Sequence, residues 1–211
     1  MIRDSPREHG KLIVKGGEKL FGSVKISGAK NAALPIMAAS LLPSEGKTKL
    51  TNLPIVADIL TLKAAMEKLG VHIHLSEGSA LIDACIINNH VMPLDDSKKM
   101  RASVLVAGPL LAKVGEAIIA EPGGCVIGNR PIDLHLMGFE ALGAKIKRLN
   151  KEYLKIKANK LRGNTINLPF PSVGATENLM MAASLAEGKT TVSNAAREPE
   201  IVDLANFLTS M

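Results

Sequence analysis

The sequence predicts an α/β (α+β) fold built from repeated units, because one pattern recurs three times along the chain. Residues 38–48 (AASLLPSEGKT) and 182–190 (AASLAEGKT) are near copies, and residues 108–120 (GPLLAKVGEAIIA) share their shape: an apolar helix end, a glycine turn and a β-prone run. The turn glycines lie 69 and 73 residues apart, at Gly46, Gly115 and Gly188. A period this long indicates a unit of several elements rather than a common solenoid repeat.

Each unit is predicted to contain a helix, a strand, a second helix and two further strands. Apolar spacing predicts helices at residues 30–42, 56–69, 98–112, 131–142, 173–186 and 199–210. Alternating runs predict two strand pairs, VHIHL with ALIDA and AKIKRL with YLKIKA. Pro35 is tolerated in a first turn, which places the start of the regular first helix near Leu34. Gly70 and Gly143 each follow a Leu and are predicted to cap the helix before them.

The predicted helices are apolar over a wide face, so the units are expected to pack around shared helices with their sheets outside. A chain of 211 residues, 46% of them hydrophobic, is long enough to bury a sizeable core. Because it has no Trp, one Tyr and four Phe, that core must consist of Ala, Leu, Ile, Val and the nine Met. The third copy stops after NAAREPEIVDLANFLTSM, just before its expected glycine cap, so we expect a truncated third unit.

Composition excludes several classes of protein. No apolar run reaches the length of about 18 residues that a membrane-spanning helix needs, and the charged N-terminus is unlike a secretory signal, so a cytoplasmic location is expected. The net charge is +6, but the basic residues are scattered and aromatic residues for base stacking are scarce. An anionic small molecule is therefore favoured over nucleic acid, with RNA binding an alternative on charge alone. The spacing of Cys and His indicates no metal site, and no cofactor is expected.

One loop combines a thiol with a cation. In AEPGGCVIGNRP (residues 120–131), Cys125 lies among glycines and five residues before Arg130, a setting that lowers a thiol pKa and admits a ligand. The alternative is a small buried cysteine in a tight turn. Cys85, within the apolar run LIDACII, is interpreted as an inert core residue.

Other candidate residues stand where a loop enters a helix. Lys30 and Asn31 lie in SGAKNAALP, Arg101 lies in KKMRASVLVAGP, and Ser172 and Gly174 lie in PFPSVGATEN. Taken singly, each has a plain alternative, a solvated side chain or a helix cap. Together with the thiol loop, they indicate a rim of junctions that binds an anionic, phosphorylated substrate.

Five segments together resemble the UDP-N-acetylglucosamine 1-carboxyvinyltransferase (enolpyruvyl transferase) family, from about Lys11 to the end of the chain. They are SGAKNAALPI, KKMRASVLVAGPLLA, PGGCVIGNRPIDLH, PSVGATENLMMAASLAEG and NAAREPEIVDLANFL. The resemblance implies transfer of the enolpyruvyl group of phosphoenolpyruvate to the 3-hydroxyl of UDP-N-acetylglucosamine, with release of phosphate. This is the first committed step of bacterial peptidoglycan synthesis.

The family fold is an inside-out α/β barrel of two domains, each made of three βαβαββ units. By this resemblance residues 1–27 would be strand segments of an absent second domain. Residues 28–211 would be the sugar-nucleotide domain, with units at about 28–95, 96–163 and an incomplete 164–211. The other half of the polypeptide would be a required partner.

Residue roles follow from the same resemblance. Cys125 would protonate phosphoenolpyruvate and react with fosfomycin, while Lys30 and Arg130 would bind the anionic groups of that substrate. The sugar nucleotide would contact Asn31, Arg101, Arg130, Pro131, Ile132, Asp133, Leu134, Ser172, Val173 and Gly174.

This chain departs from the family in two ways. Phe170, followed by Pro171, stands where some relatives have a diphosphate-binding Lys. The aspartate that deprotonates the sugar hydroxyl, and further arginines, would lie in the absent domain, so the isolated chain is predicted to be inactive. Two alternatives remain: a noncatalytic fragment that binds a UDP-sugar, and the enolpyruvyl transferase of the shikimate pathway. The GGCVIG loop and the NRPIDLH run argue against the second.

Overall fold

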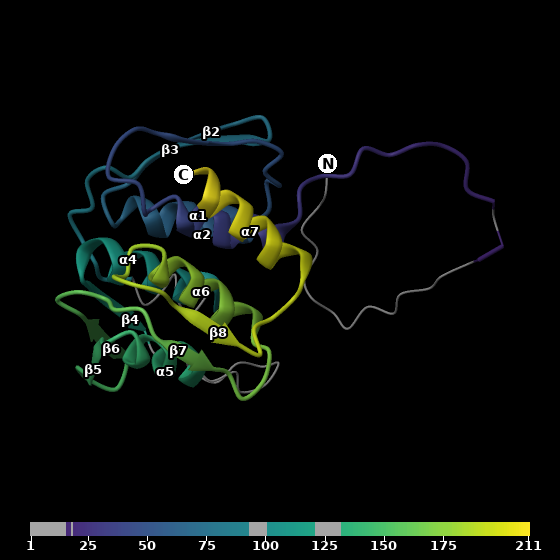
Figure 1. Cartoon of the computed structure of the whole chain (residues 1–211). Coiled ribbons are helices and arrows are strands. Elements are labelled where there is room, and N and C mark those ends of the chain that lie inside the picture. The colour runs from purple at the N-terminus through teal and green to yellow at the C-terminus, as the bar shows by residue number, and fades with distance from the viewer. Residues whose placement is uncertain (1–15, 18, 93–100, 121–131) are drawn as a thin grey trace.

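The computed structural model describes residues 16–17, 19–92, 101–120 and 132–211, and for residues 101–103 the backbone alone. Helices lie in the middle of the described body and small sheets lie on its outside (Figure 1). This arrangement, and the repeated mixture of helices and strands, confirm the predicted α/β fold.

The first two units have the same plan. The first consists of α1 (Lys30–Ala39), β1 (Thr48–Leu50), α2 (Ala57–Glu67), β2 (His72–Ser76) and β3 (Ser79–Asp83). The second consists of η1 (Arg101–Val106), α4 (Ala107–Val114), β4 (Glu116–Ala120), α5 (Asp133–Ala141), β5 (Lys145–Arg148) and β6 (Tyr153–Lys157). Each builds an antiparallel sheet with its last strand in the middle, in the orders β1-β3-β2 and β4-β6-β5.

The third unit shows that a strand comes before the first helix. It consists of β7 (Thr165–Asn167), α6 (Val173–Ala183), β8 (Thr191–Ser193) and α7 (Pro199–Ser210), and β7 pairs with β8 in parallel. In the second unit the same place is taken by Val91, which forms a parallel bridge with Ile118. The order predicted from residue patterns, which began each unit with a helix, therefore omitted a strand, because three-residue strands are too short to show an alternating pattern. The βαβαββ order implied by the family resemblance includes this strand.

The predicted glycine turns and glycine helix caps are confirmed. The three turn glycines adopt left-handed backbone conformations, with φ of +77° at Gly46, +79° at Gly115 and +84° at Gly188. Gly70 and Gly143 do the same after α2 and α5. These conformations are strained for residues with a Cβ atom, so the glycine pattern marks real turns.

Two predicted helix boundaries need correction. The helix α1 starts at Lys30 rather than near Leu34, so Pro35 lies inside it. The proline is buried and its missing N–H removes one helical hydrogen bond, a loss that the packing of α1 overrides. The helix predicted over residues 98–112 is a 3-10 turn, η1, that continues into α4 as far as Val114, while residues 98–100 lie outside the described residues.

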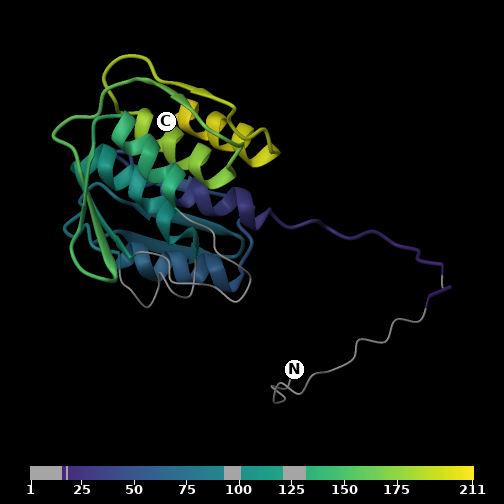
Figure 2. The same cartoon turned by 90° about the horizontal axis from the view of Figure 1, so that it is seen from below.

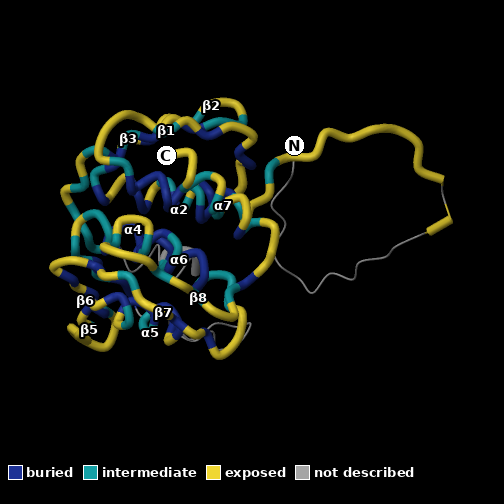
Figure 3. The backbone as a smooth tube through the Cα atoms, viewed as in Figure 1, coloured by how far each residue is buried: buried dark blue, intermediate teal, exposed yellow. Residues whose placement is uncertain are grey.

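The core lies between the helices, as Figure 3 shows for the buried parts of the backbone tube. Its largest fully buried side chains include Met37, Leu62, Leu110 and Phe139, from four different helices. Inside the body, α6 packs against α1, α4, α5 and α7. The sheets are therefore left to cover the outside. The expectation of shared central helices is confirmed.

The segment before α1 contrasts with this body. Figures 1 and 2 both show it running away from the helices. Its apolar side chains Leu20, Phe21, Val24 and Ile26 are 77–94% exposed. Among the described residues, no helix is both long and apolar enough to cross a membrane.

Candidate functional site at the helix N-termini

The start of α6 is built from a side-chain cap and two available amides. The hydroxyl of Ser172, the N-cap residue, accepts a hydrogen bond from the amide of Ala175 at 3.4 Å. Thr176 donates its own hydroxyl to the carbonyl of Ser172 at 2.8 Å, which fixes the turn. Val173 and Gly174 occupy the first helical positions, where an amide has no acceptor within the helix. These amides and the positive end of the helix dipole suit an anion.

The start of α5 meets the start of α6. Asp133 is the first residue of α5, preceded by Ile132, and Leu134 and His135 are 6% and 7% exposed. A Cβ atom placed on Gly174 would lie 3.3 Å from Cε1 and 3.5 Å from Nε2 of His135. Two of the segments predicted to bind the sugar nucleotide are therefore in contact.

A buried asparagine joins these helices to α4. Asn178 is fully buried, and its Oδ1 accepts a hydrogen bond from the amide of Gly108 at 2.7 Å. Its Nδ2 donates to the carbonyl of Val104 at 2.8 Å and lies 2.9 Å from Nδ1 of His135. The contact is so close that a Cβ atom on Gly108 would lie 2.4 Å from Oδ1. One side chain thus sets the relative positions of η1–α4, α5 and α6.

Burial makes two titratable groups near these helix starts uncharged at neutral pH. It lowers the pKa of His135 to about 4, although the carboxylate of Asp133 opposes the shift. Glu177, on α6, is 4% exposed, and burial together with the charges of Glu200 and Glu198 raises its pKa to about 8. At pH 7 the imidazole is neutral and the carboxyl is mostly protonated.

The start of α1 is open to solvent. Its N-cap residue, Ala29, provides no side-chain cap. Lys30 forms an ion pair with Asp58 of α2, with 2.7 Å between Nζ and Oδ2, and the two side chains are 49% and 38% exposed. Asn31 is also exposed. Its carbonyl oxygen receives no hydrogen bond within the helix, because Pro35, four residues later, has no N–H group. A cation here can change partners at little cost.

The helices α1, α6 and α7 begin on the same side of the body, the side from which the N-terminal segment departs (Figures 1 and 2). Of the predicted loop-to-helix junctions, those at the starts of α1 and α6 lie on this side. Arg101 begins η1, but its side chain is outside the described part of the structure. Cys125, Arg130 and Pro131 also lie outside the described residues.

Sequence reasoning did not single out Asp58, His135, Glu177 or Asn178. The last three stand within the apolar helical runs DLHLM and ATENLMM. A polar residue on the apolar face of a helix must find a hydrogen-bond partner when buried, and this was the available signal. The partner itself could not be read from the sequence, because Asn178 contacts residues 43, 70 and 74 positions away.

A second charged cluster lies at the opposite end of α4. Glu116 contacts Lys155 at 2.5 Å, Lys157 at 3.0 Å and His90 at 3.1 Å. Hydrogen bonds from the two lysines lower the pKa of Glu116 to about 2. The cluster joins neighbouring strands of the second unit, and its carboxylate is already fully engaged.

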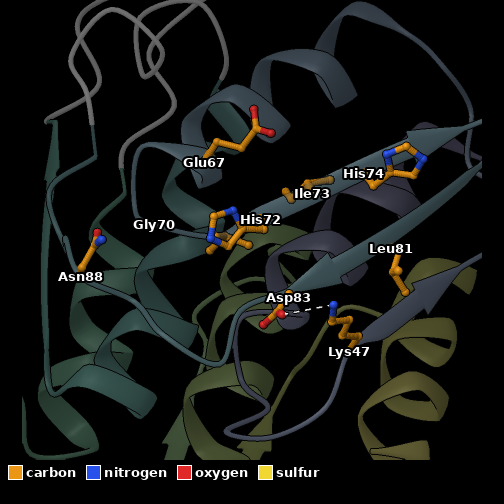
Figure 4. Close-up of a pocket in the computed structure, with 10 residues that line it drawn as sticks. Lys47, Glu67, Gly70, His72, Ile73, His74, Leu81, Asp83 and Asn88 are labelled. Atoms are coloured by element: carbon orange, nitrogen blue, oxygen red, sulfur yellow. Dashed lines mark ion pairs between the residues drawn. The ribbon is translucent and has the colours of Figure 1, made fainter.

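A shallow hollow of about 590 Å³ lies beside β2 and β3, at the end of α2 rather than at its start. Figure 4 shows His72, His74, Glu67 and the pair Lys47–Asp83, whose charged atoms are 3.7 Å apart. Among the described residues, no group of three or more His, Cys, Asp or Glu side chains could hold a metal ion. This hollow is separate from the helix starts.

The interpretation of Cys85 as a core residue was wrong. The side chain is only partly buried, and its Sγ donates a hydrogen bond to the carbonyl of Gly46 at 3.2 Å. Partial burial and the neighbouring Asp83 raise its pKa, so the thiol is protonated at neutral pH. Cys85 lies just after the end of β3 at Asp83, where the apolar run leaves the sheet.

Comparison with protein families matches residues 14–211 to the family described as EPSP synthase (3-phosphoshikimate 1-carboxyvinyltransferase). The chain is 54% identical over 201 residues to UDP-N-acetylglucosamine 1-carboxyvinyltransferase 2 of Carboxydothermus hydrogenoformans, covering 95% of this chain and 48% of that protein. It is 51% identical over 203 residues to UDP-N-acetylglucosamine 1-carboxyvinyltransferase 1 of Staphylococcus aureus, with the same coverage. The chain thus spans about half the length of these curated relatives.

Solved structures agree with the fold. The enolpyruvyl transferase NikO from Streptomyces tendae is similar with a TM-score of 0.78 at 20% identity, over 92% of this chain and 45% of that one. An EPSP synthase from Acinetobacter baumannii is similar with a TM-score of 0.66 at 21% identity, over 86% and 42%. Because these two structures are only 20–21% identical to the chain, the similarity supports the fold and not a shared function.

Proposed function

Because this chain belongs to the EPSP synthase family, we propose that it is the N-terminal half of a UDP-N-acetylglucosamine 1-carboxyvinyltransferase. The relatives that carry this name are 51–54% identical to the chain, and the chain spans 48% of their length. The proposed reaction transfers the enolpyruvyl group of phosphoenolpyruvate to the 3-hydroxyl of UDP-N-acetylglucosamine and releases phosphate. It is the first committed step of peptidoglycan synthesis, and we assign it to the cytoplasm, where phosphoenolpyruvate is made.

The chemistry is an addition followed by an elimination. The thiol of Cys125 gives a proton to C3 of phosphoenolpyruvate, and the sugar hydroxyl, losing its proton, bonds to the cationic C2. The bond from C2 to the phosphate oxygen then breaks and phosphate leaves, C3 returns a proton to the thiolate of Cys125, and the double bond forms again. The base that accepts the hydroxyl proton is assigned to the half of the enzyme that this chain does not contain, so the chain alone is expected to be inactive.

The helix starts supply what the anionic substrates need. Lys30 and Arg130 are proposed to bind phosphoenolpyruvate, and Lys30 can leave its exposed pairing with Asp58 to do so. The amides of Val173 and Gly174 are proposed to receive the diphosphate. The remaining proposed sugar-nucleotide contacts are Asn31, Arg101, Arg130, Pro131, Ile132, Asp133, Leu134 and Ser172.

The observation that carries this proposal is the contact between the starts of α5 and α6. The NRPIDLH run and the SVG run are assigned to the uridine and the diphosphate, which are adjacent in UDP-N-acetylglucosamine. The imidazole of His135 lies against Gly174, so the two runs adjoin as that ligand requires. Phe170, at 57% exposed, adds no cation there, so the contact that a lysine makes in some relatives is either lost here or made by backbone amides.

Three measurements on the purified chain test the proposal. Calorimetry with UDP-N-acetylglucosamine should show binding, fosfomycin should add covalently to Cys125, and no phosphate should be released from the two substrates together. Cys125→Ala should abolish the labelling, whereas the matched control Cys85→Ala should retain it. Failure of the unchanged chain to bind the sugar nucleotide would contradict the assignment. Binding of 3-phosphoshikimate in its place would favour the shikimate-pathway transferase, and binding without labelling would favour a noncatalytic fragment.

A further inference from the structure

The sheet of the second unit carries lysines on its outer face, on the outside of the body (Figure 1). In the pairing of β5 with β6, Lys145 stands opposite Lys157, and Lys147 stands opposite Lys155. Successive side chains of a strand point to opposite faces, so these lysines share one face while their apolar neighbours face the core. Like charges directly opposite each other destabilise a pair of strands. The sheet therefore forms against a repulsion between its own residues.

The fold does not require lysine at these positions. The first unit has the same strand order, and its strands β2 and β3 pair in the same register. There the equivalent places are taken by His72 opposite Asp83 and by His74 opposite Leu81. Because one copy of the repeat folds with histidine, aspartate and leucine on this face, the lysines of the other copy need a separate explanation.

Acidic residues neutralise this face only in part. Glu116 on β4 pairs with Lys155 at 2.5 Å and with Lys157 at 3.0 Å. Within the described ranges of the chain, no acidic side chain pairs with Lys145 or Lys147, and both of these lysines are exposed. The two lysines of β5 therefore keep their charge for an anion that comes from outside the body.

A hollow of about 440 Å³ lies where this face meets the loop after β6. Its lining includes Lys145 and Lys157 from the strands, and Lys160, Arg162 and Asn159 from the loop. None of the described residues that line it is acidic. A hollow of this size can take a small molecule, and this one presents cations from two separate segments.

Backbone hydrogen bonds hold the loop that lines this hollow. The amide of Ala158 donates to the carbonyl of Gly115, at the end of α4, at 2.9 Å. The amide of Arg162 donates to the carbonyl of Leu142, at the end of α5, also at 2.9 Å. Both ends of the loop are thus fixed before a ligand arrives, which lowers the ordering cost of binding.

One ion pair at the edge of the hollow would have to yield to a ligand. Lys160 pairs with Glu187, and their side chains are 62% and 52% exposed. The hydrogen bond from Lys160 and the charge of Arg162 lower the pKa of Glu187. An exposed pair of this kind contributes little to stability, so both cations can turn to a ligand that carries more negative charge.

We propose that this hollow is a second anion site, which binds a small molecule carrying two or more phosphate groups. A single phosphate reaches only some of the lining cations, whereas linked phosphates can contact the strands and the loop together. The guanidinium of Arg162 can hold one phosphate through two parallel N–H donors, and the lysines act on the others as point charges.

This hollow is separate from the proposed substrate site. Gly143, which also lines it, follows the last turn of α5, whereas Asp133 begins that helix. A helix of nine residues puts about 12 Å between its ends. A ligand in the hollow therefore leaves the helix starts open, and the inference goes beyond the proposed function without depending on it.

Inorganic tripolyphosphate is the probe, because it carries linked phosphates and neither base nor sugar. Titration into the 15N-labelled chain at low ionic strength should shift the amide resonances of Gly143, Lys145 and Arg162, and calorimetry should give the affinity. Orthophosphate should bind at least about 10-fold more weakly, because it engages fewer cations. Shifts confined to the starts of α5 and α6, or equal affinities for the two anions, would overturn the inference.

Substitutions at exposed positions separate a site from diffuse attraction. Lys145→Gln and Arg162→Gln should each weaken tripolyphosphate binding about 10-fold, because each removes a charge-assisted hydrogen bond. The matched control Lys151→Gln removes the same charge from the exposed turn between β5 and β6, and should change the affinity less than about twofold. Lys145→Gln also removes the repulsion from Lys157, so its unfolding midpoint should not fall. Equal losses of affinity in all three variants would show diffuse attraction only.

UDP-N-acetylglucosamine distinguishes this site from the proposed substrate site. Lys145→Gln should bind the sugar nucleotide as the unchanged chain does, and tripolyphosphate should still bind when the sugar nucleotide is saturating. Displacement of tripolyphosphate by the sugar nucleotide would place the probe at the helix starts and overturn the inference. If tripolyphosphate binds at the hollow and the sugar nucleotide does not bind at all, only the proposed function fails. Tighter binding of an oligoglutamate peptide than of tripolyphosphate would overturn the choice of ligand in favour of an acidic protein partner.

Discussion

The helices α1 and α6 occupy equivalent places in the first and third units, yet their first turns differ. At α6 a serine caps the helix, and a fully buried asparagine fixes the neighbouring helices. At α1 the cap residue is Ala29, which accepts no hydrogen bond through its side chain, and the charged Lys30 is half exposed. One repeat position has thus become rigid and the other adaptable.

The difference shows how a repeated fold can divide the work of binding. Backbone amides at α6 are held by bonds made within the body, so they are in place before an anion arrives. The ammonium group of Lys30 is held only by a surface ion pair with Asp58, which exchanges readily for another anion. We expect substitutions in the first turn of α6 to change the free energy of unfolding. Substitution of Lys30 in α1 should instead change mainly the positive charge that is available to an anion.

The largest effect is expected where α6 is packed most closely. A methyl group at Gly108 would lie 2.4 Å from Oδ1 and 2.5 Å from the carbonyl oxygen of Asn178, and the second of these is backbone. Gly108→Ala should therefore lower the free energy of unfolding by about 3 kcal/mol. Urea unfolding of Gly138→Ala, which meets only side-chain atoms of Leu179, is the comparison. A smaller loss for Gly108→Ala than for Gly138→Ala would refute the rigid account of α6.

The next effect concerns the buried acid of α6. Burial, Glu200 and Glu198 raise the folded pKa of Glu177 to about 8, above its ordinary 4.5. Between these values the folded chain binds more protons than the unfolded chain, so this group makes stability fall as pH rises from about 5 to 8. Glu177→Gln should remove on the order of 2 kcal/mol of that fall, since local relaxation relieves part of the penalty.

Chemical unfolding at a series of pH values measures this dependence. Glu45→Gln, at an exposed position of the first unit, is the matched control and should leave the slope of stability against pH unchanged. Equal slopes for the unchanged chain and Glu177→Gln would show that the buried carboxyl ionises freely.

Substitutions of the N-cap residues of α6 and α1 should change the free energy of unfolding moderately and in opposite directions. Ser172→Ala removes the acceptor for the amide of Ala175 and should cost about 1 kcal/mol of stability. Ala29→Ser adds an acceptor at a residue that already has extended backbone, φ −79° and ψ 129°, and should add a few tenths to about 1 kcal/mol. Thermal unfolding of both variants measures the pair. No gain from Ala29→Ser would mean that the start of α1 cannot accept a cap.

The smallest effect is expected at the exposed ion pair. Lys30→Met should change the free energy of unfolding by no more than about 0.5 kcal/mol, and less at high salt, because solvent screens both partners. Asp58→Asn removes the other partner and should behave alike. Denaturant unfolding at low and high ionic strength distinguishes this from a structural pair. A loss of more than about 2 kcal/mol would place Lys30 in the rigid framework instead.

Much of the local structure followed from the sequence because its signals are local. Positive-φ glycines such as Gly46 and Gly188 and the apolar periodicity of the helices depend on residues close together in the chain. The start of α1 was misplaced because tertiary packing overrode the usual cost of Pro35 inside a helix. The strand β7 was missed because it is defined by pairing with β8, which lies beyond an intervening helix.

The candidate site divides in the same way. Lys30 and Ser172 could be selected because each stands at a visible junction between a loop and a helix. His135, Glu177 and Asn178 look like ordinary helical residues until their burial and partners are known. The sequence by itself determined the repeat, its turns and the residue types available at each helix start. Only the tertiary structure decided which polar side chains became buried and bonded, because hydrogen bonds between distant segments exist only once the helices pack.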